Sequence, residues 1–198
     1  MTWVTPRTYI FGELMTVAIA NEQWRDNEKY LGRIAGSPIL NIGNAIAPVS
    51  GVTPAAIEQI ESSGAAPKPN MYQARFDAAA DEGLMWQFTL PPAFTGVLDL
   101  KVYYYMASAI AGDVVFVAQV SAKSDADAGM TSRTFDAANS QAVTVPGVAG
   151  TLDVATITMT NDDGMAAGDE VILLLYRDAN AGGDTAAGDC IVTDLRIE

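Results

Sequence analysis

Hydrophobic residues occupy every second position over several stretches between residues 71 and 198. From Leu84 to Leu90, for example, large apolar side chains alternate with more polar or smaller ones. Successive side chains of a strand point to opposite faces, so this period predicts β-strands with at least one buried face. The stretches with this pattern are 84–90, 98–106, 114–120, 142–145, 152–159, 170–177 and 190–197.

Clusters of turn-forming residues separate these stretches. NDDGMAAGD and DANAGGDTAAGD are two examples, rich in the Gly, Asp and Asn that turns require. No helical period lies between the predicted strands. Many short strands without intervening helices are typical of an antiparallel β-sandwich or jelly roll. We therefore predict an all-β domain over residues 71–198.

Some of the predicted strands carry bulky side chains on both faces. Tyr103 and Tyr105 lie on one face of their strand and Tyr104 on the other. In the same way, Val115 and Val117 lie on one face of their strand and Phe116 on the other. One face supplies the core of the domain, and the second face then needs cover. Self-association provides such cover, so we predict that Tyr103, Tyr105, Val115 and Val117 form an oligomer interface.

Residues 1–33 follow a helical rather than a strand period. Val17, Ala20, Trp24, Asn27 and Leu31 fall at spacings of three or four, which predicts one short amphipathic helix on an extended arm. A helix of about 15 residues is marginal in isolation. It therefore has to dock on another surface.

Residues 34–70 are rich in Gly, Pro, Ala, Ser and Asn and show no sustained period, apart from a possible short helix over 54–61. We predict an extended linker or arm here. Its five Ile, Leu and Val residues between positions 39 and 49 are too many for a freely solvated tether. The segment lies along another protein surface or along a neighbouring copy of itself, or it packs back on its own domain.

Charge is distributed unevenly along the chain. Residues 76–198 hold 18 of the 24 acids and 5 of the 11 bases, and thus the entire net charge of −13. Nucleic acid and anionic membranes would be repelled by such a surface, so we expect neither as a partner. The N-terminus also lacks the pattern of an export signal, since Arg7 is followed by Glu13 without an apolar run.

The residue inventory argues against catalysis and against a cofactor. The chain contains no histidine, which excludes Ser-His and Cys-His nucleophile pairs and the usual zinc sites. No phosphate-binding glycine loop is present. The lone cysteine, Cys190, lies in an alternating stretch and is predicted to be a small core residue.

A hard cation such as calcium is the one metal that the loops suggest. The weak candidates are Asp178, Asn180 and Asp184 in DANAGGDT, which offer oxygen ligands at loop spacing. Turn chemistry explains the same residues, because Asp and Asn cap their own backbone. Both explanations remain open from the sequence.

Two stretches carry a resemblance to a known class of proteins. The opening W-x-T-P-R-T-Y-x-x-G-E-x-x-T-V-A-x-x-N-x-x-x-R-D-N, over residues 3–27, resembles the N-terminal segment of many structural proteins of tailed bacteriophages. Residues 168–198 are similar in pattern to the last two strands of jelly-roll modules on such virion proteins. The resemblance implies a homotrimeric virion surface protein, made in the host cytoplasm and anchored by its N-terminal segment.

Two functions from different classes follow from this resemblance. In the first, the chain is a capsid decoration or cement protein whose Trp3, Tyr9, Trp24 and Leu31 bury against the major capsid protein or another virion protein. The absence of a long repetitive shaft favours this function. In the second, it is a tail or head fibre protein that recognises a host surface glycan through residues such as Tyr103, Tyr105 or Arg133.

Overall fold

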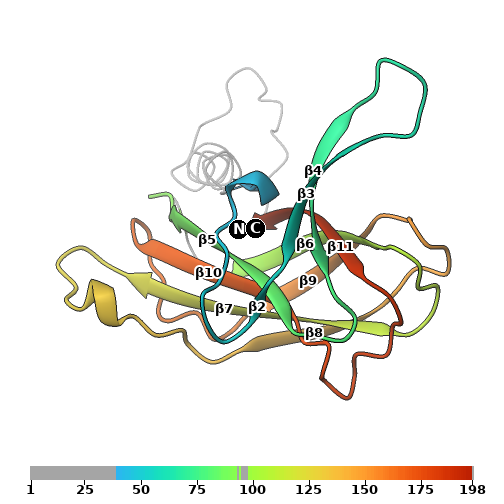
Figure 1. The fold of residues 1–198 in the computed structure, drawn as a ribbon. Helices are drawn as coiled ribbons and strands as arrows, with labels where there is room; N and C mark the ends of the chain where they lie inside the picture. Colours follow the sequence, from blue (N-terminus) through green and yellow to red (C-terminus); the bar gives the residue numbers. More distant parts are fainter. Residues whose placement is uncertain (1–38, 93, 95–97, 198) are drawn as a thin grey trace, which may run out of the picture.

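Two β-sheets stacked face to face form the protein in the computed structural model, which describes residues 39–92, 94 and 98–197 (Figure 1). Sheet A has the strand order β3 (Ala56–Glu61), β4 (Asn70–Phe76), β11 (Cys190–Ile197), β6 (Leu98–Met106) and β9 (Asp153–Met159), and β1 (Ile39–Leu40) pairs with β11. Sheet B has the order β2 (Thr53–Pro54), β5 (Glu82–Thr89), β10 (Glu170–Arg177), β7 (Asp113–Lys123) and β8 (Asn139–Thr144). Within these residues the only helical segments are two short 3-10 turns, η2 (Ile42–Asn44) and η3 (Met130–Ser132).

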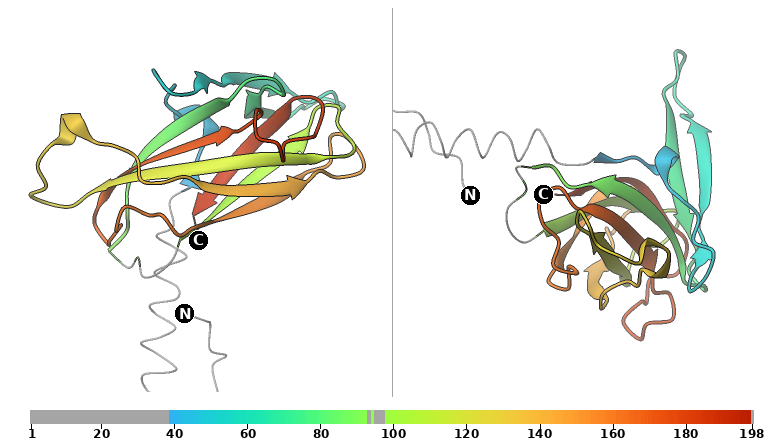
Figure 2. Two further views of the ribbon diagram at one scale, coloured as in Figure 1. Left: turned by 90° about the horizontal axis from the view of Figure 1, so that it is seen from below. Right: turned by 90° about the vertical axis from the view of Figure 1, so that its left-hand side faces the viewer.

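The strands pair in the antiparallel sense, except that β2 runs parallel to β5. This architecture is an all-β jelly-roll sandwich and confirms the predicted fold class. Figure 2 shows the two layers from the side, with the β3–β4 hairpin standing away from them. Among the described residues, no helix has the length and apolar character needed to cross a membrane.

The core lies between the sheets and follows the period of two. In β6 the buried residues alternate strictly with half-buried ones, and the inward set includes Tyr104, whose ring meets Phe116 of β7 edge to face at 5.1 Å. The Tyr104 hydroxyl donates to Asp153 Oδ2 at 3.1 Å, so its polar end is satisfied. Cys190 is fully buried among the apolar core residues, which confirms its predicted position.

The prediction of a linker over residues 34–70 is wrong for the part that the structure describes. Leu40 and Ile42 are buried in the core, and the Trp86 indole donates to Asn41 O at 3.0 Å. The apolar side chains of this segment therefore pack on its own domain, which was the other alternative. The domain begins by residue 39 rather than at residue 71.

The predicted helix over 54–61 is also wrong, because residues 56–61 form strand β3. Its six residues pair with β4 from Ala56 opposite Arg75 to Glu61 opposite Asn70. Helix propensity is a weak local preference, and pairing with a strand from elsewhere in the chain overrides it. The predicted anchoring segment 1–33, with its helix, lies outside the described residues.

Candidate functional site

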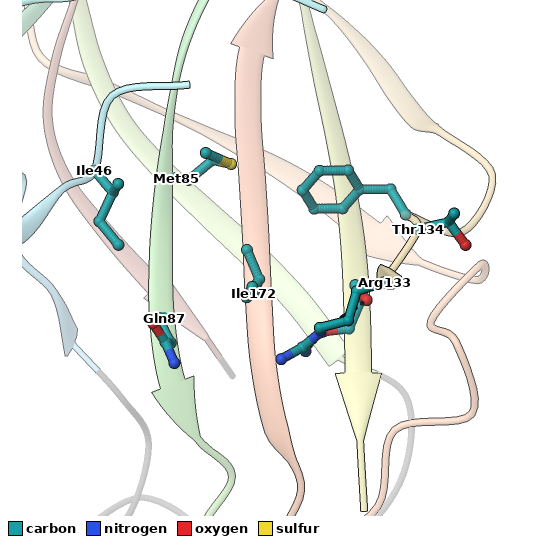
Figure 3. A pocket seen from close by; sticks show the side chains of 8 residues that line it. Ile46, Met85, Gln87, Arg133, Thr134 and Ile172 are labelled. Carbon is teal, nitrogen blue, oxygen red and sulfur yellow. Dashed lines mark hydrogen bonds between the residues drawn. The ribbon is translucent and has the colours of Figure 1, made fainter. Parts of the chain in front are cut away.

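A groove lies on the outer face of sheet B, the face that points away from sheet A. Its volume is about 280 Å³. The side chains that line it come from segments far apart in the sequence (Figure 3): Ile46, Met85, Gln87, Ser121, Arg133, Thr134, Phe135 and Ile172. Four of these eight side chains are apolar, and they supply most of the exposed surface of the groove.

Strands β5, β10 and β7 form the floor of the groove. Ile172 on β10 lies opposite Gln87 on β5 and opposite Ser121 on β7, so these three side chains form one row across the sheet. Each faces outward because its neighbours along the strand fill the core on the other face. The strand register therefore builds the floor.

Two further segments extend the floor beyond these strands. Ile46 joins the free edge of β5 through backbone hydrogen bonds in both directions with Met85, at 2.7 and 2.9 Å. On the other side, the Asp136 amide donates to Val120 O at 2.9 Å, and the Gln119 side-chain amide donates to Asp136 O at 2.9 Å. These two segments thus continue the surface of the sheet beyond β5 on one side and beyond this part of β7 on the other.

Residues 133–135 form one wall of the groove. Arg133 connects this wall to the floor by hydrogen bonds. Its Nη1 lies 2.6 Å from Glu170 Oε1, and its Nη2 donates to Ser121 O at 2.6 Å and to Glu170 O at 3.0 Å. Its Nε lies 3.3 Å from Ser121 Oγ. The side chain is only 8% exposed, so this wall is held by a shielded, charge-assisted contact.

The lining combines apolar surface with hydrogen-bonding groups. Met85, Ile172 and the half-buried Phe135 supply apolar surface. The Gln87 side-chain amide and the Thr134 hydroxyl make no hydrogen bond to any other described side chain or backbone group. A concave apolar surface with a few polar groups at fixed positions is typical of a small-molecule or oligosaccharide site.

The predicted oligomer interface divides into two parts. Val115 and Val117 of β7 are 5% and 3% exposed. The Val115 side chain lies beside Gly183, and Asp184 Oδ2 accepts a hydrogen bond from its amide at 3.0 Å. The chain itself covers both valines, which corrects the prediction that a second copy has to cover them.

Tyr103 and Tyr105 are half-buried on the outer face of sheet A. The Arg196 guanidinium lies 5.1 Å from the centre of the Tyr103 ring, a cation–π contact. The Tyr105 hydroxyl donates to Gln73 Oε1 at 2.7 Å, and burial raises the pKa of this tyrosine. These two residues therefore lie on the opposite side of the sandwich from Arg133, the third residue suggested for glycan binding.

The suggested cation ligands Asp178, Asn180 and Asp184 are not gathered into a metal cage. Asp184 grips the buried Arg177, with Arg177 Nε 2.9 Å from Oδ2 and Nη2 2.7 Å from Oδ1. The Asn180 amide donates to Asp81 Oδ1 at 3.0 Å. Within the described residues, no group of three or more Asp, Glu, Cys or His side chains is arranged to hold a metal ion. Asp184 and Asn180 therefore have structural roles, because their side chains bind Arg177 and Asp81.

The predicted attachment residues Trp3, Tyr9, Trp24 and Leu31 lie outside the described residues. Of the groove, the sequence pointed only to Arg133. The outward positions Met85, Gln87 and Ile172 were visible in the period of two, but nothing local showed that Ile46 and Phe135 flank them.

Comparison with known proteins identifies no family. No protein-family model and no curated protein matches the sequence. One similar solved structure is a family 35 carbohydrate-binding module from Clostridium thermocellum, with a TM-score of 0.45 and 14% identity over 81% of this chain and 96% of that chain. A second is a family 35 module from Cellvibrio japonicus, with a TM-score of 0.42 and 14% identity over 82% of this chain and 92% of that chain. Another holds the N-terminal modules of a C. thermocellum endo-1,4-β-D-xylanase, one of them a carbohydrate-binding module, complexed with xylohexaose (TM-score 0.43, 14% identity, 80% of this chain). This chain spans 26% of the xylanase chain.

Proposed function

We propose that this β-sandwich is a glycan-binding module whose site is the groove on the outer face of sheet B. The observation that carries the proposal is the lining itself, in which Phe135 and Ile172 supply apolar surface beside the amide of Gln87 and the hydroxyl of Thr134. Sugars present C–H faces that pack on aromatic rings and hydroxyls that exchange hydrogen bonds with such groups. The groove offers both kinds of contact.

The groove favours binding rather than hydrolysis. Glycoside hydrolysis uses a pair of carboxyl groups on either side of the scissile bond. None of the side chains that line the groove carries a carboxyl group, and the nearby Glu170 is engaged by Arg133. We therefore propose a non-catalytic role.

Of the two virion functions, we favour the fibre or receptor-binding function over the decoration function. The groove supplies a site for the glycan that this function requires. The need for cover from a second copy now rests on Tyr103 and Tyr105 alone, because Val115 and Val117 are already buried within one chain. Self-association through Tyr103 and Tyr105 remains a prediction. Light scattering of the full chain tests it, since a monomer mass would contradict it.

Attachment to a virion through residues 1–33 remains part of the proposal. It rests on the resemblance of residues 3–27 to phage structural proteins. The test is co-sedimentation of the full-length protein with particles. Trp24→Ala should reduce the bound fraction, whereas equal binding by this variant and the wild type would contradict the attachment role of Trp24.

A glycan array probed with the full chain tests the binding function. We expect retention on at least one oligosaccharide, and Phe135→Ala should weaken it by about tenfold or more, since fully burying a Phe side chain contributes roughly 1.5–3 kcal/mol. Tyr103→Ala is the matched control, because it removes a half-buried aromatic from the opposite sheet. Loss with Tyr103→Ala alone would move the site to sheet A, and no retention on any glycan would overturn the proposal.

A further inference from the structure

The groove contains one charged side chain among the residues that line it. Arg133 is that residue, and its charge is balanced by Glu170, whose Oε1 lies 2.6 Å from Nη1. The two opposite charges are in direct contact, so this pair presents little net charge to a ligand, although only the Arg133 side chain is shielded from solvent, at 8% exposed against 36% for Glu170. The groove is thus electrically neutral at its one charged position.

Nearly all of the N–H donors of Arg133 already have a hydrogen-bond partner. A guanidinium has five N–H donors, and the contacts to Ser121 and Glu170 occupy four of them. A carboxylate is bound best by two parallel N–H donors of one guanidinium, and Arg133 has no such pair left. A single donor remains, which suits a neutral hydroxyl oxygen.

The surroundings of the groove do not favour an anion either. Lys123 lies opposite Glu170 in the β10–β7 ladder and does not line the groove. Residues 76–198 carry the entire net charge of −13, and this field repels anionic ligands at low salt. The Arg133–Glu170 ion pair and the negative charge of the domain therefore both disfavour the binding of an anionic ligand.

We propose that the groove selects neutral glycans over acidic ones, and that Glu170 sets this selectivity by neutralising Arg133. The inference rests on the proposed glycan-binding function and deepens it. Glu170→Gln keeps the shape of the side chain and removes its charge. Arg133 then presents an uncompensated positive charge to the groove, so the preference for neutral glycans should shrink.

The experiment measures affinities of the full chain for neutral hexasaccharides of glucose, mannose and galactose. Each is compared with the same hexasaccharide carrying C6 carboxylates in place of hydroxymethyl groups. We expect the wild type to prefer a neutral member by about tenfold or more, and Glu170→Gln to reduce this ratio by about tenfold. Its retained affinity for the neutral hexasaccharide shows that the variant is folded.

Glu58→Gln is the matched control, because it changes the net charge equally and also breaks an ion pair with an arginine, at the edge of sheet A. The ratio of its affinities for the neutral and the carboxylate hexasaccharide should equal that of the wild type. A wild type that binds the carboxylate form as tightly would overturn the inference while the glycan-binding function stands. An unchanged ratio in Glu170→Gln would overturn the role of Glu170. No binding to either series would overturn the inferred selectivity, whereas the glycan array decides the binding function itself.

Discussion

Arg177 and Asp184 form a two-point ion pair in the interior of the sandwich, where their side chains are 0% and 2% exposed. Arg177 stands at the end of β10 and also donates to the carbonyl oxygens of Ala186 and Gly188, each at 2.8 Å. These four hydrogen bonds of the guanidinium therefore hold the loop between β10 and β11 against the end of the sandwich. The pair fixes the path of a loop that has no regular secondary structure of its own.

Removing the carboxylate of this pair should destabilise the protein strongly. Asp184→Asn leaves Arg177 buried without a counter-charge, and breaking a buried pair in this way costs about 3–5 kcal/mol. Urea unfolding followed by circular dichroism measures the loss. Asp194→Asn breaks the exposed pair with Arg196 and should cost less than about 1 kcal/mol. Equal losses in the two variants would contradict the structural role of Asp184.

Calcium should leave the thermal stability unchanged. Both oxygens of Asp184 are within hydrogen-bond distance of Arg177, and the Asn180 amide is bonded to Asp81. A cation would have to break the buried ion pair before it could use Asp184 as a ligand. Differential scanning calorimetry of chelator-treated protein, with and without added calcium, tests this. A rise in the melting temperature with calcium would contradict it.

Stability should fall on acidification in part through Glu58. Hydrogen bonds from Arg75 and Gln73 hold the pKa of the Glu58 carboxyl below its usual range. A carboxyl with a lowered folded pKa stabilises the fold above its unfolded pKa of about 4.3 and loses that contribution as the pH falls through the folded pKa. Urea midpoints between pH 7 and pH 3 should therefore fall less steeply for Glu58→Gln than for the wild type. Parallel curves would refute this contribution.

Cys190 should be inert in the folded protein. Its side chain is completely buried, and this burial raises the pKa of the thiol far above neutral pH. The thiolate is the reactive form, so a thiol reagent at neutral pH should label the protein only after unfolding in urea. Rapid stoichiometric labelling of the native protein would show that the β11 region opens easily.

Local alternation predicted strands β5 to β11, because the period of two is contained in the strand itself. The same period, followed from Val171 through Leu173 and Leu175, also places Arg177 on the buried face. The sequence therefore indicates that Arg177 is buried, but not which residue it pairs with. Strands β3 and β4 were both missed. The sequence of β3 favours a helix, and only its pairing with β4 makes it a strand. Pairing between distant segments is not encoded in local periodicity.

The groove was beyond prediction for the same reason. It needs the register of β5, β10 and β7, the bridge between Ile46 and Met85, and the position of residues 133–136 beside β7. Each of these is a contact between segments far apart in the sequence. Arg133 was suggested from the sequence as a residue that contacts a glycan, but its partner Glu170 appears only in the fold.

The most direct test of glycan binding in the groove is an amide NMR titration of the full-length protein with a neutral hexasaccharide that the array has identified. We expect the largest shift changes on residues of the groove, among them Gln87, Phe135 and Ile172. Changes confined to the outer face of sheet A around Tyr103, or no changes at a saturating concentration, would contradict the proposed site.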